Sequence, residues 1–314
     1  MASPRVPTGI RGWRVVGRRD GVVQATRATR VFRRMTPGSH AMPDFICVTC
    51  GTQYPDSPLP REQCVICTEE RQYVGWKGQG WTTLAQLQAD HHNRLEPEAP
   101  GLVGIGTEPR FALGQRALHV RTGNGGFLWD CLSLVDDATV AAVQALGGVA
   151  GIAISHPHYY SSMGEWSRAL GGVPIYLHAE DSHWVVRHDR SIVFWDGDTR
   201  EVAPGITLIR CGGHFAGGTV LHWADGADGA GALLTGDIIM VGEDRRTAGF
   251  MYSYLNFIPL NARAVQRIGA MVEPFEFEHV YGAWFGRNIL AAGKHAVRYS
   301  VRRYVHAISD RGRP

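Results

Sequence analysis

Short apolar runs, bounded by glycine, proline and other turn residues, recur through the last two thirds of the chain. Runs of this length with turn signals between them are typical of β-strands. The pattern predicts strands at residues 102–106, 116–121, 126–130, 149–154, 174–178, 192–195, 207–211, 220–223 and 232–235. Residues 226–231 are expected to form a hairpin turn.

Segments with helical periodicity alternate with these runs. They predict helices at residues 82–93, 135–146, 161–170, 180–188, 261–272 and 289–308. Asp136 and Asp137 stand at the start of the second of these, where carboxylates suit the helix dipole. Strands followed by a helix thus occur twice along the chain, which predicts an α/β fold class.

The first 41 residues have a different composition. They contain nine arginines and one aspartate, so the rest of the chain carries −5 although the whole chain carries +3. The mildly acidic remainder argues against nucleic-acid binding by the folded body. For residues 1–41, three interpretations stay open: a disordered basic arm, a transit-like or nucleic-acid-binding tail, or an extension upstream of a natural start at Met42.

No apolar run approaches the ~20 residues that a transmembrane helix needs, so we expect no membrane insertion. At 314 residues the chain can hold one large domain and one small module.

Four of the six cysteines form two C-x-x-C pairs, separated by thirteen residues. Each pair can present two sulfurs to one tetrahedral ion, and four protein ligands close the site, which is typical of a structural role. Residues 42–75 therefore predict a four-cysteine metal module with Cys47, Cys50, Cys64 and Cys67 as ligands. Cysteine pairs of this kind favour a reducing compartment, so we expect a cytoplasmic protein. Residues 76–99 are interpreted as a linker and the first predicted helix.

The cysteine module resembles a zinc ribbon and also the short rubredoxin-like module of rubrerythrins. The first resemblance implies zinc and the second implies iron. Four thiolates suit both metals, so both ions stay open.

Two histidines, His156 and His158, follow the apolar run at residues 149–154 with Pro157 between them. Because proline restricts its own backbone and that of its neighbour, the two imidazoles are expected to converge on one cation. His214 and Asp237 each follow a later apolar run beside glycine. Three histidines and one carboxylate would suit a single Zn, Fe or Mn ion with an open position.

In their order and rough spacing, these residues resemble the motifs of the metallo-β-lactamase superfamily, over residues 100–314. The resemblance implies an αββα sandwich, with His156, His158 and His214 as ligands of the first metal position and Asp237 as the aspartate that bridges the two positions. It also implies that Leu128-Trp129-Asp130 is the early strand that ends in Asp. Tyr160, Ser161 and Trp284 stand where this superfamily has ligands of the second metal position. The resemblance therefore implies a degenerate second site and one ion in the body.

Further residues are candidates for supporting roles. Asp237 could also act as a base, and a phenol at Tyr160 or Tyr159 could donate to a developing oxyanion. His178 follows a strand and could be a supporting partner or an extra ligand. Arg245 and Arg246 fall in a loop that borders the substrate pocket in this superfamily, and they could bind a carboxylate or phosphate.

The resemblance implies a metal-dependent hydrolase that acts on an ester, thioester, lactone or similar acyl bond of a small molecule. Two alternatives stay open. A rubredoxin-like module beside this fold also resembles flavodiiron-type redox proteins, and loss of the second-site ligands is equally expected of a catalytically silent binding member.

Overall fold

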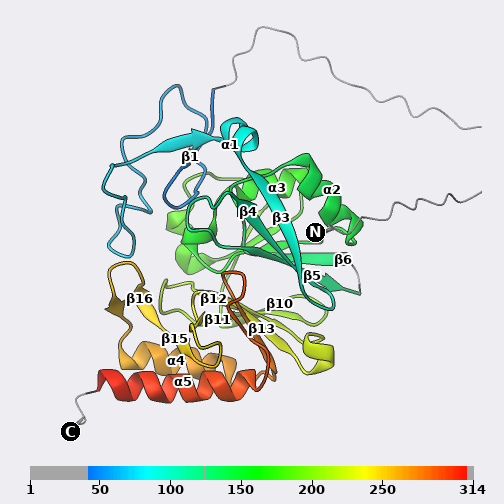
Figure 1. Ribbon diagram of the computed structural model, residues 1–314, viewed down its shortest axis with the longest axis vertical. Helices are drawn as coiled ribbons and strands as arrows, with labels where there is room; N and C mark the ends of the chain where they lie inside the picture. Colours follow the sequence, from blue (N-terminus) through cyan, green and yellow to red (C-terminus); the bar gives the residue numbers. More distant parts are fainter. Residues whose placement is uncertain (1–41, 124, 310–314) are drawn as a thin grey trace, which may run out of the picture. The chain divides into compact units, whose positions relative to one another are not determined.

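Two β-sheets pack face to face, and helices cover both outer faces (Figure 1). The computed structural model describes residues 42–123 and 125–309. The expected αββα order is visible from top to bottom in Figure 1, as α2 and α3, the first sheet, the second sheet, and α4 and α5. The predicted αββα sandwich is thereby confirmed.

The first sheet has seven strands in sequence order, and it changes from antiparallel to parallel pairing at β6. Its strands are β3 (His92–Ala99), β4 (Leu102–Glu108), β5 (Ala117–Thr122), β6 (Gly125–Trp129), β7 (Ile152–Ala153), β8 (Ile175–His178) and β9 (Ile192–Trp195). The parallel strands β6, β7 and β8 end at one edge of the sheet, so the residues that follow them are brought together there.

The second sheet has six strands in the order β10-β11-β12-β13-β18-β19. They are β10 (Thr199–Ala203), β11 (Ile206–Arg210), β12 (Thr219–Trp223), β13 (Ala232–Gly236), β18 (His279–Gly282) and β19 (Asn288–Ile289). The parallel pairing of β13 with β18 places the loop after Gly282 beside the end of β13.

Apolar side chains from both sheets meet in a shared core, which includes Trp129, Trp195, Leu221 and Leu234. The helices α2 (Asp137–Ala145) and α3 (Met163–Ala169) bury apolar residues against the outer face of the first sheet. The helices α4 (Ala262–Val272) and α5 (Gly293–Ile308) do the same for the second sheet. Burial of these faces supplies most of the driving force for the layered fold.

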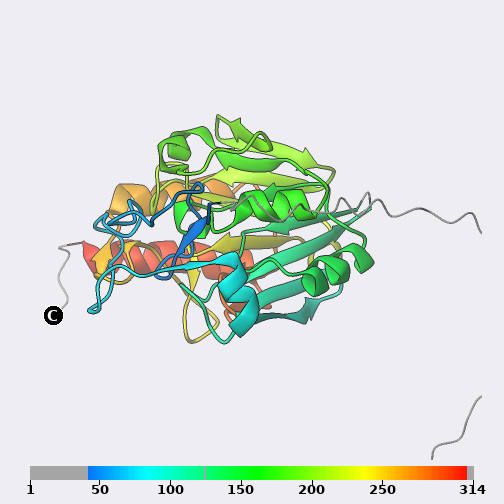
Figure 2. The ribbon, with the colours of Figure 1, turned by 90° about the horizontal axis from the view of Figure 1, so that it is seen from above.

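The four-cysteine ribbon, residues 42–83, has one short strand near each end and is followed by α1 (Leu84–Asp90). Its strands β1 (Phe45–Cys47) and β2 (Trp81–Thr83) are antiparallel. Two further small sheets lie between β13 and α4, formed by β14 (Met240–Val241) with β15 (Ala248–Gly249), and by β16 (Met251–Ser253) with β17 (Ile258–Pro259). Figures 1 and 2 place the ribbon at the same end of the molecule as the hairpin of β16 and β17.

Several predicted elements need correction. The helix expected at residues 82–93 ends at Asp90, and β3 starts at His92, so the first sheet begins before residue 100. The segment expected as a helix at residues 180–188 is a 3-10 helix, Ala179–Trp184. The C-terminal helix starts at Gly293, after β19 and not at residue 289.

Two other expectations concern the domain division of the chain and the membrane. Residues 1–41 lie outside the described residues, and the division of the chain into ribbon, linker and body domains stays a prediction. Among the helices of residues 42–309, none combines the length and the apolar character required to cross a bilayer.

Candidate metal centres

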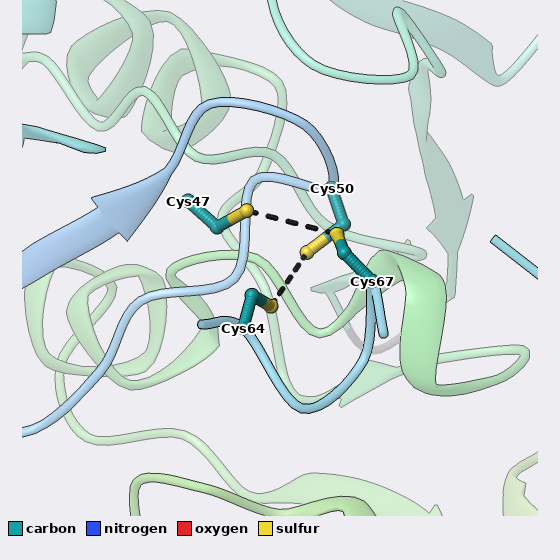
Figure 3. A group of neighbouring side chains, drawn as sticks. All are labelled: Cys47, Cys50, Cys64 and Cys67. Atoms are coloured by element: carbon teal, nitrogen blue, oxygen red, sulfur yellow. Dashed lines mark hydrogen bonds between the residues drawn. The ribbon is translucent and has the colours of Figure 1, made fainter. Parts of the chain in front are cut away.

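The four ribbon cysteines are buried and face one another (Figure 3). The Sγ atoms of Cys47 and Cys67 lie 3.7 Å apart, and those of Cys50 and Cys64 lie 3.6 Å apart. Sulfurs on a tetrahedron around zinc, with bonds of about 2.3 Å, would be about 3.8 Å apart. All six cysteines of the chain are free thiols, so these distances do not reflect disulfides. The geometry therefore fits a four-thiolate metal site.

Two side chains of the ribbon donate hydrogen bonds to these sulfurs. The Tyr54 hydroxyl donates to Cys64 Sγ at 3.3 Å, and Gln79 Nε2 donates to Cys47 Sγ at 3.2 Å. Tyr54 is held edge-on against Trp81, with ring centroids 5.1 Å apart. Donors of this kind stabilise the thiolate form, which is the form that binds a metal.

The body holds a second group, formed by His156, His158 and His214, and all three are at most 2 % exposed. His156 follows β7, and His158 lies in the 3-10 helix Pro157–Tyr159. His214 follows β11 after two glycines with φ of +70° and +85°, a backbone conformation that side-chain-bearing residues rarely adopt. Asp237 follows β13. The strand ends thus bring together all four residues predicted for the body site.

One nitrogen from each of the three histidines lies close enough to the others to share an ion, and Asp237 adjoins His156. His158 Nδ1 and His214 Nε2 lie 3.2 Å apart, and His156 Nε2 lies 3.3 Å from Asp237 Oδ1. Nitrogen and oxygen ligands on a tetrahedron around zinc would be about 3.3 Å apart. Among the described residues, the buried atoms without a hydrogen-bond partner include His156 Nε2, His158 Nε2 and Asp237 Oδ1. Because such atoms are costly to bury, they indicate that a cation belongs between them.

The remaining nitrogens of two of these histidines orient the rings. His156 Nδ1 contacts Ser155 Oγ at 2.9 Å, and the Ser155 amide donates to Asp130 at 2.8 Å. His214 Nδ1 lies 3.1 Å from the Met251 carbonyl, so it carries the proton there. Both contacts leave Nε2 turned toward the shared centre, as expected for metal-binding imidazoles.

Burial dominates the electrostatics of the group. It lowers the pKa of His156 and of His158 well below the usual histidine range, so both imidazoles are neutral and ready to bind a cation. Burial also raises the pKa of Asp237, an effect that the nearby His214 and the Tyr159 phenol oppose. A bound cation would favour the ionised carboxylate of Asp237.

The residues at the second metal position turn their polar atoms to other partners. The Tyr160 hydroxyl donates to the Asp181 carbonyl at 3.3 Å, and the Trp284 indole donates to the Leu113 carbonyl at 3.1 Å. Ser161 Oγ accepts from Gln115 at 3.3 Å. Within residues 42–123 and 125–309, the four cysteines and the three histidines are the groups of metal-binding side chains that come close enough to share an ion.

Of the residues predicted to support the site, one lies beside the histidines and the others do not. Tyr159, not Tyr160, lies at the histidines, with its ring centroid 4.4 Å from that of His156. His178 uses both ring nitrogens elsewhere: Nε2 contacts the Gly197 carbonyl, and Nδ1 accepts from the Glu180 amide. Arg245 and Arg246 line a cavity of about 750 Å³ with residues of α5, and none of the histidine group lines it.

Two residues near the group had no role in the sequence analysis. The Phe215 ring packs against all three imidazoles, with centroid distances of 4.8 to 5.4 Å. Arg71 of the ribbon stacks on Phe215 and donates to the His214 carbonyl at 2.9 Å. The position of Phe215 directly after His214 was a usable signal, whereas nothing near Arg71 in the sequence indicated this contact.

Solved structures with a similar fold are metallo-β-lactamases. DIM-1 is 14% identical, with 69% of this chain and 98% of that chain covered and a TM-score of 0.52. FIM-1 from Pseudomonas aeruginosa, in its mono-zinc form, is 14% identical, with coverage of 68% and 96% and a TM-score of 0.50. VMB-1 gives a TM-score of 0.54 at 13% identity, with coverage of 69% and 99%. At these identities the likeness shows the fold.

No family model matches the chain. A protein of Bacillus subtilis (strain 168), the uncharacterized protein YmaE, is 44% identical over 271 residues, which are 86% of this chain and 98% of YmaE. The match thus includes nearly the whole of YmaE. The chain has the metallo-β-lactamase fold and belongs to the same protein family as YmaE.

Proposed function

We propose that the protein is a metal-dependent hydrolase with one ion in its body site. His156, His158 and His214 would hold the ion, and Asp237 would be its fourth ligand or the base that accepts a proton. The observation that carries this proposal is the pair of buried atoms without partners, His156 Nε2 and Asp237 Oδ1, at tetrahedral spacing.

A divalent ion held there would supply Lewis acidity toward water and toward a substrate carbonyl. The chain supplies orientation and a dry environment. Ser155 and the Met251 carbonyl fix two imidazole rings, and Phe215 excludes water from the side where it packs. Asp237 is the carboxylate within reach of His156, so it is the group that could hold a proton at the reacting centre.

One ion, and not two, fits the residues at the second position. Tyr160 and Trp284 use their polar atoms on backbone carbonyls, and an indole N–H can only donate. We propose an ester, thioester, lactone or similar acyl bond of a small molecule as the substrate class. A single ion held by the three histidines would supply the Lewis acidity that hydrolysis of such a bond requires.

For the ribbon, we propose a structural ion on Cys47, Cys50, Cys64 and Cys67. Because all four ligands come from the protein, no position would be open for a substrate. Zinc is our first candidate, and iron would give the ribbon the colour of a rubredoxin-type centre.

A second candidate, a binding protein without catalysis, is favoured by one observation. The histidines are nearly inaccessible, and Arg71 and Phe215 lie directly beside them. Three surface cavities, of about 390, 500 and 750 Å³, lie on α4, α5 and the β14–β15 turn, and the histidines line none of them.

The test combines metal analysis with a panel of ester, thioester and lactone substrates. Wild-type protein should hold one ion beyond that of the ribbon and hydrolyse at least one acyl class. His156→Ala should lose that ion and the activity, whereas His188→Ala, at an exposed histidine, should keep both. A bound body ion without hydrolysis of any acyl class would favour the binding protein.

A further inference from the structure

The ribbon segment Glu69–Gln72 lies against the loop that carries His214. Arg71 Nη1 donates to the His214 carbonyl at 2.9 Å, and its guanidinium lies 4.1 Å from the centroid of Phe215. Glu69 holds the guanidinium from the other side, with 2.8 Å between its Oε2 and Arg71 Nε. The Arg71 side chain is only 13% exposed. This is a fixed contact, because a carbonyl acceptor, an aromatic ring and a carboxylate all position one guanidinium.

The same segment is bound by the hairpin of β16 and β17 (Figure 1). The Tyr252 hydroxyl lies 2.8 Å from Glu70 Oε1, and Ser253 Oγ donates to the Arg71 carbonyl at 3.0 Å. Asn256 Nδ2 donates to the Glu70 carbonyl at 2.7 Å. The ribbon segment is therefore held between this hairpin and the His214 loop.

His214 is held in place both by β16 and by the ribbon segment. Its ring nitrogen Nδ1 contacts the Met251 carbonyl, at the start of β16, and its own carbonyl accepts from Arg71. Gly212 and Gly213, which precede it, both have positive φ and add little stiffness. The position of His214 relative to His156 and His158 is thus set in part from the ribbon.

The cysteine cluster reaches this contact in two ways. Only three residues separate Cys67 from Arg71. A Cys64–Cys67 turn held by a metal would therefore restrict the position of the Arg71 backbone. Trp184 packs against the cysteine cluster on one side, and its ring lies 5.7 Å from that of Phe215 on the other. Both routes connect the thiolates to the residues that surround the histidines.

We propose that the four-cysteine ribbon is an integral part of the histidine site, with Arg71 as a positioning residue for His214. Metal in the ribbon would then strengthen metal binding by the histidines. This inference rests on the proposed function, because it presumes an ion at the histidine group. Since coupling between two binding sites is reciprocal, metal in the histidine group would strengthen metal retention by the ribbon by the same factor.

The test uses the full chain loaded with ¹¹³Cd, whose resonance in four thiolates is well separated from that in nitrogen and oxygen ligands. Arg71→Ala should leave the ribbon resonance in place and shift the histidine-site resonance. Competition with a chelator should show that its histidine site binds cadmium about tenfold more weakly or worse, as expected for loss of a charged hydrogen bond. Arg71→Lys, which can still donate to the His214 carbonyl, should recover part of the affinity.

The matched control is Arg187→Ala. Arg187 also joins ribbon to body, through Gln53 at 2.8 Å and Asp44 at 2.6 Å, but its contacts do not include the histidine group. We expect its histidine site to bind cadmium as the wild type does. Tyr252→Phe, which removes the phenol contact with Glu70 and leaves Arg71 intact, should weaken the site to an intermediate degree and guards against a variant that does not fold.

Cys64→Ser completes the test, since it removes the ribbon ion without touching the histidines. Its histidine site should weaken about as much as that of Arg71→Ala. Equal cadmium affinities of the histidine site in Arg71→Ala, Arg187→Ala and wild type would overturn this inference but leave the proposed function standing. A wild-type protein with only the thiolate resonance would overturn the proposed function and, with it, this inference.

Discussion

The adjacent residues Tyr159 and Tyr160 are both buried, yet their phenols have different surroundings. The Tyr160 hydroxyl donates to the Asp181 carbonyl, whereas Tyr159 Oη has no partner among the described residues and lies at His156 and Asp237. From the sequence, either phenol could act near the ion, and Tyr160 stands where the superfamily has a metal ligand. The 3-10 turn that starts at Pro157 instead directs Tyr159 to the histidines.

We therefore expect Tyr159→Phe to change the affinity of the histidine site for its ion, because the phenol borders the carboxylate that completes the donor set. Tyr160→Phe should cost about 1 kcal/mol of stability through its lost hydrogen bond and leave metal affinity unchanged. Chelator competition and thermal unfolding measure the two effects. The opposite pattern would restore Tyr160 as the residue near the ion.

His119 gives a pH-dependent prediction that is independent of any metal. It is buried, and Nε2 faces the Gly148 carbonyl at 2.9 Å. Burial lowers the pKa of His119 below the ordinary value of about 6.5, so the unfolded chain binds this proton more readily than the folded one. Its contribution to stability is complete above that pH and is lost as pH falls toward the folded pKa.

The stability difference between wild type and His119→Gln should therefore change with pH in the acid range. As the pH falls below about 6.5, the wild type should lose stability relative to the variant, by at most about 1.4 kcal/mol per pH unit. Denaturant unfolding at a series of pH values measures this. A stability difference between wild type and variant that does not change with pH would contradict the lowered pKa of His119 in the folded state.

At the residue scale, the sequence was sufficient to predict site residues that are recognisable by their type and by their position after a strand. His156, His158, His214 and Asp237 each follow an apolar run, and strand ends in a sandwich gather at one edge. Arg71 could not be found in this way. Its role depends on how the ribbon packs on the body, a contact between segments 143 residues apart that no local pattern encodes.

At the scale of elements, several strands missed from the sequence are incompletely buried or very short. β3 contains Pro97 and several charged side chains and lies at the edge of its sheet, where proline and charge are tolerated. Its apolar alternation is therefore weak, and the helical pattern before it was extended too far. The two-residue strands β14, β15 and β17 are too short to show any period.

The ribbon is the element whose stability should depend on an ion. Cys64→Ser should release one equivalent of metal and lower the melting temperature, because metal binding contributes folding free energy in such modules. Cys131→Ser is a suitable control, since Cys131 is buried but lies outside the four-cysteine group. Equal metal content in the two variants would argue against a ribbon site, and mass spectrometry under native conditions counts the ions.

At the scale of the whole molecule, the hydrogen bonds between ribbon and body imply that the two unfold together. Arg71, Arg187 and Ser133 each join them, the last by donating to the Gly51 carbonyl at 2.7 Å. By contrast, residues 1–41 are rich in arginine and lie outside the described part of the chain. We expect a chain that starts at Met42 to unfold at the same temperature as the full chain in a calorimetric scan. A loss of several degrees would mean that these residues pack on the body.

The total metal content tests the prediction that each chain holds two different metal centres. Four thiolates at 3.6 to 3.7 Å spacing and three histidines with Asp237 provide donors for two ions per chain. At the second body position, Tyr160, Ser161 and Trp284 bond to other protein groups, and His178 uses both of its ring nitrogens. A third ion would therefore need ligands drawn from existing hydrogen bonds, at a cost of about 1–3 kcal/mol for each group left unpaired. Metal analysis of the purified full chain should give two equivalents, falling to one in either Cys64→Ser or His156→Ala. Three equivalents in the wild type would contradict the single-ion body site and point to His178 as the first residue to replace.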